Sequence, residues 1–130
     1  LKEGGVAVLN ADDAKFVALQ NICAARHIKV LGFGKAGKEL RLIAATPTPH
    51  GQQIVLSLLG KEIKCEVELV GEFQVMNILA ALGLLAGMGE NIHNAASFIP
   101  LLRGVHGRLE KVATSKTGAP VFIDYAHTPA

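Results

Sequence analysis

The N-terminal part of the chain passes from an apolar segment through a helix-like segment to a second apolar segment, and this order restricts the fold most. The run Gly5–Leu9 predicts a buried strand, and in the polar turn after it Asp12 or Asp13 is expected to cap the next helix. That helix carries apolar residues at a 3.6-residue period, at Phe16, Leu19, Ile22 and Cys23. A second strand is expected at Ile28–Leu31. A strand, a helix and a strand in this order predict a parallel pair with a right-handed crossover.

The middle of the chain changes to a period of two, which is typical of antiparallel strands with one solvated face. The apolar residues that alternate with charged ones are Ile63, Cys65, Val67 and Leu69. Gly60-Lys61 predicts a two-residue hairpin turn back to a strand at 54–58. With a third strand near 40–44, these segments predict a small antiparallel three-stranded meander.

A long helix is expected next, over residues 72–86. Its predicted buried stripe is Val75, Ile78, Leu79, Leu82 and Leu85. Small residues such as Gly83 allow it to lie close to the sheet, and Gly87 or Gly89 can end it. A further helix is expected at 91–102, and strands at 109–113 and 121–123. We therefore predict one α/β domain over residues 1–130, a mostly parallel sheet with flanking helices plus the meander.

Composition excludes several classes of partner. The net charge is +2 and no two basic residues are adjacent, which argues against binding to nucleic acid or an anionic membrane. The longest apolar stretch, Ile78–Met88, is shorter than the roughly 20 residues that span a bilayer. Cys23 and Cys65 form no disulfide framework and fit a reducing compartment. Cys23 and His27 are four residues apart but lack a second ligand pair, so no metal site is expected and Cys23 is interpreted as a buried apolar residue.

Two glycine-rich nucleotide motifs fail in this chain. Gly32–Gly37 fits the G-x-G-x-x-G pattern, but no amphipathic helix follows it and no acid lies about 20 residues later, so a flexible surface loop is expected. A phosphate-binding P-loop needs Gly-Lys before Ser or Thr, whereas the Gly-Lys pairs here precede Ala36, Glu39 and Glu62. This chain therefore cannot hold the β- and γ-phosphates of ATP in the usual way.

Chemically active side chains follow the last predicted strand. Asp124-Tyr125-Ala126-His127 comes directly after the apolar run 121–123, and ligands of open α/β sheets bind beyond the carboxyl ends of strands. Asp124 suits the hydroxyls of a ribose, and the guanidinium of Arg108 suits phosphate oxygens. An acid and an arginine of this kind together suggest a nucleotide.

Four segments in this order resemble a known family. They are Asn10-Ala11-Asp12-Asp13, Gly71-Glu72-Phe73-Gln74-Val75-Met76-Asn77, Gly107-Arg108-Leu109-Glu110 and Asp124-Tyr125-Ala126-His127-Thr128-Pro129. Together they resemble the Mur ligases of peptidoglycan synthesis, and most closely the MurE type. The resemblance implies that residues 1–130 are the second half of the central ATP-binding domain. The P-loop and magnesium ligands are then expected upstream of Leu1, and a hinge to a third domain at about 125–130.

The resemblance implies a cytoplasmic ligase that uses ATP and Mg²⁺. Such an enzyme phosphorylates the D-glutamate carboxylate of UDP-MurNAc-L-Ala-D-Glu, and diaminopimelate or lysine then displaces the phosphate. By position, Gln74 and Asn77 are expected to contact the nucleotide, Asn77 at its adenine end. Arg108 is expected at the phosphates, Asp124 at the ribose, and His127 near the phosphoryl transfer. Gln74 replaces the family's usual Asn, and His106 replaces its usual Pro.

Two alternatives stay open. One is a non-catalytic nucleotide-binding module without a P-loop. The other is a ligase of the folylpolyglutamate synthetase kind, which resembles the run from Asp124 but usually has Gly at position 125 and Asn at position 128. On the first interpretation the chain alone is expected to be inactive, and its uncovered sheet edge is expected to make it self-associate.

Overall fold

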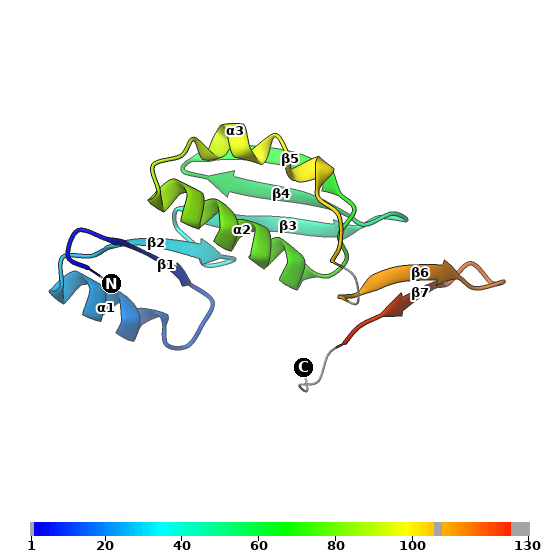
Figure 1. The fold of residues 1–130 in the computed structure, drawn as a ribbon, viewed down its shortest axis with the longest axis horizontal. Helices are drawn as coiled ribbons and strands as arrows, with labels where there is room; N and C mark the ends of the chain where they lie inside the picture. Colours follow the sequence, from blue (N-terminus) through cyan, green and yellow to red (C-terminus); the bar gives the residue numbers. More distant parts are fainter. Residues whose placement is uncertain (1, 106–107, 126–130) are drawn as a thin grey trace.

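The computed structural model describes residues 2–105 and 108–125, which form one five-stranded sheet with helices on both faces and a separate two-stranded sheet (Figure 1). The main sheet has the order β1-β2-β3-β4-β5, formed by Val6–Asn10, Lys29–Gly34, Leu40–Pro47, Gln52–Leu58 and Lys61–Val67. The first two pairings are parallel and the last two are antiparallel. The predicted α/β class and the antiparallel meander are thus confirmed, and the meander continues the parallel strands within one sheet.

The side chains of β1 alternate between two helices, which places these helices on opposite faces of the sheet. Ala7 packs with Cys23 of α1 (Phe16–Ala25). Val8 lies instead against Gly83 of α2 (Glu72–Gly87). Because successive side chains of a strand point to opposite faces, β1 is covered on both sides. This is the arrangement that the predicted strand, helix and strand require.

Only part of the predicted apolar face of α1 is buried. Cys23 is buried and Phe16 is half-buried, whereas Leu19 and Ile22 are 42% and 55% exposed. The main contacts of α1 are with β1 and β2, which cover only part of its apolar stripe. The helix and its apolar face are thus present, but Leu19 and Ile22 on that face are largely exposed.

The core lies between the sheet and α2. Four of the five predicted stripe residues of α2 are buried, and Leu85 packs at the margin. Facing side chains of β3 and β4, led by Leu40, Ile54, Leu56 and Leu58, are completely inaccessible. The helix ends at Gly87, and the positive φ of Gly89 just beyond it allows the amide of Glu90 to bond back to the Leu85 carbonyl. No helix in the described ranges is long and apolar enough to cross a membrane.

The hairpin between β4 and β5 turns one residue earlier than predicted. Leu58 pairs with Lys61, so the turn is Leu59-Gly60 and Lys61 belongs to β5. Both turn residues have positive φ, which gives the twist that two-residue hairpins favour. In β5 the charged residues Lys64 and Glu66 face solvent, as the period of two predicts.

The glycine motif at 32–37 forms a tight return rather than a flexible loop. β2 and β3 are parallel but overlap only at two pairs, Phe33 with Leu40 and Gly34 with Arg41. Parallel strands usually need a long crossover. Here a short turn is enough to connect the two strands, because they run side by side for only two residue pairs. Gly34 has φ +125°, and a Cβ at Gly37 would lie 2.8 Å from the backbone of Phe33 and Gly34, so side chains are excluded from the turn.

The C-terminal elements differ from the predictions in two ways. The helix expected at 91–102 is only α3 (Ile92–Ala96) and a 3₁₀ turn, η1 (Ile99–Leu101), because Pro100 cannot continue an α-helix. The last strands, β6 (Glu110–Thr114) and β7 (Pro120–Ile123), pair antiparallel with each other. Their apolar residues Val121 and Ile123 are exposed, because a two-stranded sheet has no second layer to cover them.

Gly83→Ala is expected to destabilise the chain. A Cβ at this position would lie 2.6 Å from Val8 Cγ1 and 3.0 Å from Leu40 Cδ1, so α2 must move away from the sheet. Overpacking of this kind costs about 1–3 kcal/mol. Gly87→Ala, where the nearest atom is Val6 Cγ1 at 3.3 Å, is the graded control and should have a smaller effect. Urea unfolding of both variants tests this, and an unchanged or higher midpoint for Gly83→Ala would contradict the close packing of α2.

Candidate functional site

A cavity lies where the meander, α2 and the β6–β7 hairpin meet. Its volume is about 570 Å³. One wall is the β3–β4 loop from Pro47 to Gly51, and a second is the segment that leads into α2. The third wall is formed by Arg108–Lys111 and by Pro120 and Phe122 of β7. A cavity of this size with a few polar side chains is typical of a small-molecule site.

Gln74 and Asn77 lie together in the first two turns of α2. Gln74 is half-buried and lines the cavity. Asn77 is exposed one turn later, and its Nδ2 donates to Gln74 Oε1 over 3.4 Å. Residues three apart on a helix are neighbours, so the two amides form one polar edge. Amides of this kind can both donate to and accept from a nucleobase.

Arg108 lies across the cavity from α2. Its side chain is exposed and lines the same cavity as Gln74. The nearby Leu109 contributes a Cδ1 atom 3.4 Å from where a Cβ of Gly71 would stand, so this segment packs directly on the start of α2. The structure thus brings Gln74 and Arg108, which are far apart in the sequence, to one cavity, and Asn77 is joined to them only through its hydrogen bond to Gln74.

Two predicted site residues are not joined to this group. Asp124 directly follows β7, is exposed and does not line the cavity. His127 lies outside the described residues, as do His106 and the proposed hinge beyond residue 125. Phe122, two residues before Asp124, does line the cavity.

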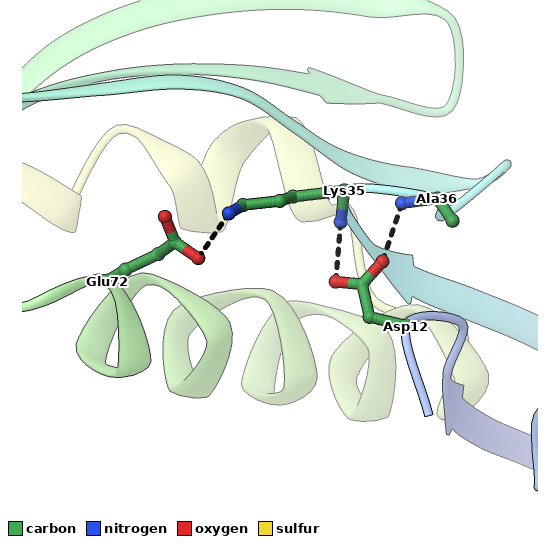
Figure 2. A network of polar contacts seen from close by, with 4 residues as sticks. All are labelled: Asp12, Lys35, Ala36 and Glu72. Carbon is green, nitrogen blue, oxygen red and sulfur yellow. Dashed lines mark hydrogen bonds and ion pairs between the residues drawn. The ribbon is translucent and has the colours of Figure 1, made fainter. Parts of the chain in front are cut away.

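A polar network that the sequence did not predict holds the start of α2 to the glycine turn (Figure 2). The carboxylate of Asp12 accepts hydrogen bonds from the backbone N–H groups of Lys35 and Ala36, at 2.8 and 2.7 Å. Lys35 Nζ in turn forms a 2.7 Å ion pair with Glu72, the first residue of α2. The network therefore ties the end of β1, the β2–β3 turn and α2 together.

Asp12 or Asp13 was expected to cap α1, but Asp12 binds elsewhere and Asp13 accepts only from the N–H of Lys15, the residue at the N-cap. The N-cap of α1 is Lys15, which makes no side-chain cap, and its N–H is bound by Asp13 Oδ1 instead. Asp12 points to the glycine turn, where Gly34 leaves room for its carboxylate. The hydrogen bond and the opposite charge of Glu72 raise the pKa of Lys35 above its ordinary value, so this lysine is charged throughout the neutral range.

Gln52 is a second residue that the pattern did not single out. It begins β4 and is buried, and its Nε2 donates to the carbonyls of Leu69 and Gly71 at 3.0 and 2.9 Å. The sequence could have indicated its burial, because Gln52 lies on the same face of β4 as the buried Ile54 and Leu56, which follow at every second position. A polar residue at a core position must find hydrogen-bond partners.

The described residues offer no site for a resident metal. No group of three or more His, Cys, Asp or Glu side chains within them could hold an ion. Cys23 is buried in α1, as expected, and desolvation raises the pKa of the half-buried Cys65 thiol. The magnesium that the resemblance implies thus finds no ligand set among these residues.

Comparison with known proteins identifies the family. Residues 1–85 match the model of the Mur ligase middle domain. The chain belongs to the Mur ligase family. It is 36% identical over 125 residues to the UDP-N-acetylmuramoyl-L-alanyl-D-glutamate–2,6-diaminopimelate ligase of Zymomonas mobilis, covering 96% of this chain and 26% of that protein. The chain therefore spans about a quarter of the length of the curated relative.

Solved structures share the fold at lower identity. MurF from Acinetobacter baumannii superposes with a TM-score of 0.73 at 20% identity, covering 89% of this chain and 25% of that one. Folylpolyglutamate synthase from Mycobacterium tuberculosis, complexed with ADP, gives 0.70 at 24% identity over 94% of this chain and 27% of that one. These likenesses confirm a Mur ligase domain fold, and they do not distinguish between ligases that share it.

Asp12→Ala is expected to loosen the glycine turn. The variant removes a charged acceptor of two backbone N–H groups, a loss of about 1 kcal/mol or more. Hydrogen exchange of the Lys35 and Ala36 amides should become faster. Asp13→Ala removes an acid from the same turn without touching these amides and is the matched control. Unchanged exchange at both amides in Asp12→Ala would show that its carboxylate does not hold the turn.

Proposed function

We propose that this chain forms the adenosine side of the ATP site in a longer amide ligase of peptidoglycan precursor synthesis. The observation that carries the proposal is that Gln74, which is hydrogen-bonded to Asn77, lines one cavity together with Arg108 in a chain of the Mur ligase family. The name of the Zymomonas mobilis relative supports UDP-N-acetylmuramoyl-L-alanyl-D-glutamate as the acceptor and 2,6-diaminopimelate as the added amino acid. Lysine, the other amino acid considered, has no such support.

The proposed reaction activates a carboxylate, which is a poor electrophile at neutral pH. The γ-phosphoryl group of ATP passes to the D-glutamate carboxylate, and ADP leaves. The amine of the added amino acid then attacks the acyl phosphate, and inorganic phosphate leaves as the amide forms. In phosphoryl transfer, catalysis consists mainly of positioning and of stabilising charge. Within this scheme the residues described here bind and orient the nucleotide.

Each site residue has a role suited to its chemistry. The amides of Gln74 and Asn77 recognise the base, and Arg108 binds the phosphates through its planar guanidinium. Asp124 is proposed to accept hydrogen bonds from the ribose hydroxyls, and His127 is proposed to act at the transferred phosphoryl group. Magnesium, when bound, neutralises charge on the phosphates, and we place its ligands and the P-loop outside residues 1–130.

The proposal extends to the setting of the protein. We propose a cytoplasmic enzyme in which residues 1–130 are the second part of the central domain and the hinge to a third domain lies at about 125–130. Alone, the chain is proposed to be inactive and to self-associate, and the exposed apolar side chains of α1 support the latter. A folylpolyglutamate synthetase activity is less well supported, because that likeness extends to the fold alone.

The activity is tested with the full-length protein that contains this chain. Phosphate release is measured with ATP and UDP-N-acetylmuramoyl-L-alanyl-D-glutamate, with diaminopimelate, lysine or no amino acid added. We expect release that needs the nucleotide-linked dipeptide and diaminopimelate, and a product enlarged by one diaminopimelate residue. Turnover with a folate and glutamate in place of these substrates would favour the alternative ligase. ATP binding without turnover on either set would favour the non-catalytic module.

Asp124→Ala and Arg108→Ala should mainly raise the KM for ATP in that enzyme. Loss of one hydrogen bond to a charged group corresponds to about a tenfold change or more. Asp124→Asn, which keeps one acceptor oxygen, should be milder. Lys116→Ala removes an exposed charge from the β6–β7 turn and serves as the control for Arg108. An unchanged KM for ATP with normal turnover in Asp124→Ala would exclude the ribose role.

A further inference from the structure

Gln52 occupies an unusual position between the core and the cavity. Among the polar and charged residues of the described ranges it is the one whose side chain is buried, with 5% exposure. It directly follows the loop Pro47–Gly51, which forms one wall of the cavity. Its amide is thus fixed by the core on one side and adjoins the candidate site on the other.

The two acceptors of Gln52 flank the turn into α2. Nε2 donates to the carbonyls of Leu69 and Gly71, so both hydrogens of the amide are used. Leu69 and Val70 line the cavity, and Gly71 is the N-cap of α2. Gly71 has no side chain to cap the helix, and its φ of +92° places it in a conformation that other residues rarely adopt. The position of this turn therefore depends on a partner from another element.

The turn controls where the predicted nucleotide contacts lie. Gln74 follows Gly71 by three residues, its N–H bonds to the Gly71 carbonyl at 3.2 Å, and Asn77 in turn bonds to Gln74. A shift of the turn would move both amides relative to the β3–β4 loop and Arg108. Gln52 holds the loop side and the helix side of the cavity at a fixed separation.

We propose that Gln52 is a positioning residue for nucleotide binding. It does not touch the nucleotide. Through the Leu69 and Gly71 carbonyls it sets the place of Gln74 and Asn77 against the opposite wall. The inference rests on the proposed function of the cavity as part of an ATP site. On this inference the buried amide does more than find hydrogen-bond partners in the core, because it also positions the nucleotide-binding residues.

The test uses the full-length enzyme and compares Gln52→Leu with two controls. Leucine keeps the approximate volume but donates no hydrogen bond, so the turn loses both ties. Gln53→Leu makes the same change at the next, exposed position of β4. Leu58→Ala, at the far end of β4, destabilises the same core without contact to the cavity. Gln52→Asn, which keeps the amide on a shorter side chain, is the milder variant if Gln52→Leu fails to fold.

We expect Gln52→Leu to raise the KM for ATP about tenfold or more, because small displacements of binding groups are costly. The KM for the nucleotide-linked dipeptide should stay within about twofold, because the turn before α2 positions groups for the nucleotide and not for that substrate. Gln53→Leu should resemble the wild type, and Leu58→Ala should lower the melting temperature with the KM for ATP unchanged. Gln52→Asn should lie between wild type and Gln52→Leu.

The outcomes separate this inference from the proposed function. An active wild type, together with Gln52 variants that lose stability at an unchanged KM for ATP, would overturn the positioning role alone. A wild type that neither binds nor turns over ATP would overturn both the proposed function and the role of Gln52. A raised KM for ATP in Gln52→Leu and Gln52→Asn, absent from both controls, supports the proposal.

Discussion

The packing of α2 on the sheet is the interaction on which the rest of this structure depends. The helix contacts β1, β2 and β3, and its buried stripe meets the side chains of the antiparallel strands. It therefore joins the parallel and antiparallel halves in one core. The close approach requires a residue without a side chain at Gly83, where Val8 and Leu40 converge. A helix held in this way is a rigid base for functional groups at its N-terminus.

Two polar contacts from other parts of the sheet reach that N-terminus. On one side, Asp12 orders the glycine turn, and Lys35 extends from the turn to Glu72 (Figure 2). On the other side, the amide of Gln52 binds the carbonyl of Gly71 just before the helix. The apolar core sets the axis of α2, whereas these ties set where its first turn begins. Site residues such as Gln74 thus lie on an element whose position is determined by both packing and hydrogen bonds.

The sequence predicted best where one local period governs a whole element. The stripe of α2 and the alternation in β5 both appear in the structure, because burial on one face imposes the period. Prediction failed where a distant partner decides. Asp12 bonds to amides 23 and 24 residues away rather than to the next helix, and the glycine motif forms a turn between parallel strands. Both features depend on residues that are distant in the sequence, and no local periodic pattern indicates them.

The candidate site shows the same division. Gln74, Asn77 and Arg108 were selected through the order of motifs in a family, and the structure brings Gln74 and Arg108 to one cavity, with Asn77 hydrogen-bonded to Gln74. Gln52 belongs to no such motif, and its role follows only from two carbonyls that the fold places beside it. Ligases that share this fold differ in what they join, so the fold cannot specify the substrate. On the proposed function, selectivity for the nucleotide comes from the spacing of the Gln74 amide and the Arg108 guanidinium across the cavity. That spacing depends on how firmly the turn before α2 is held.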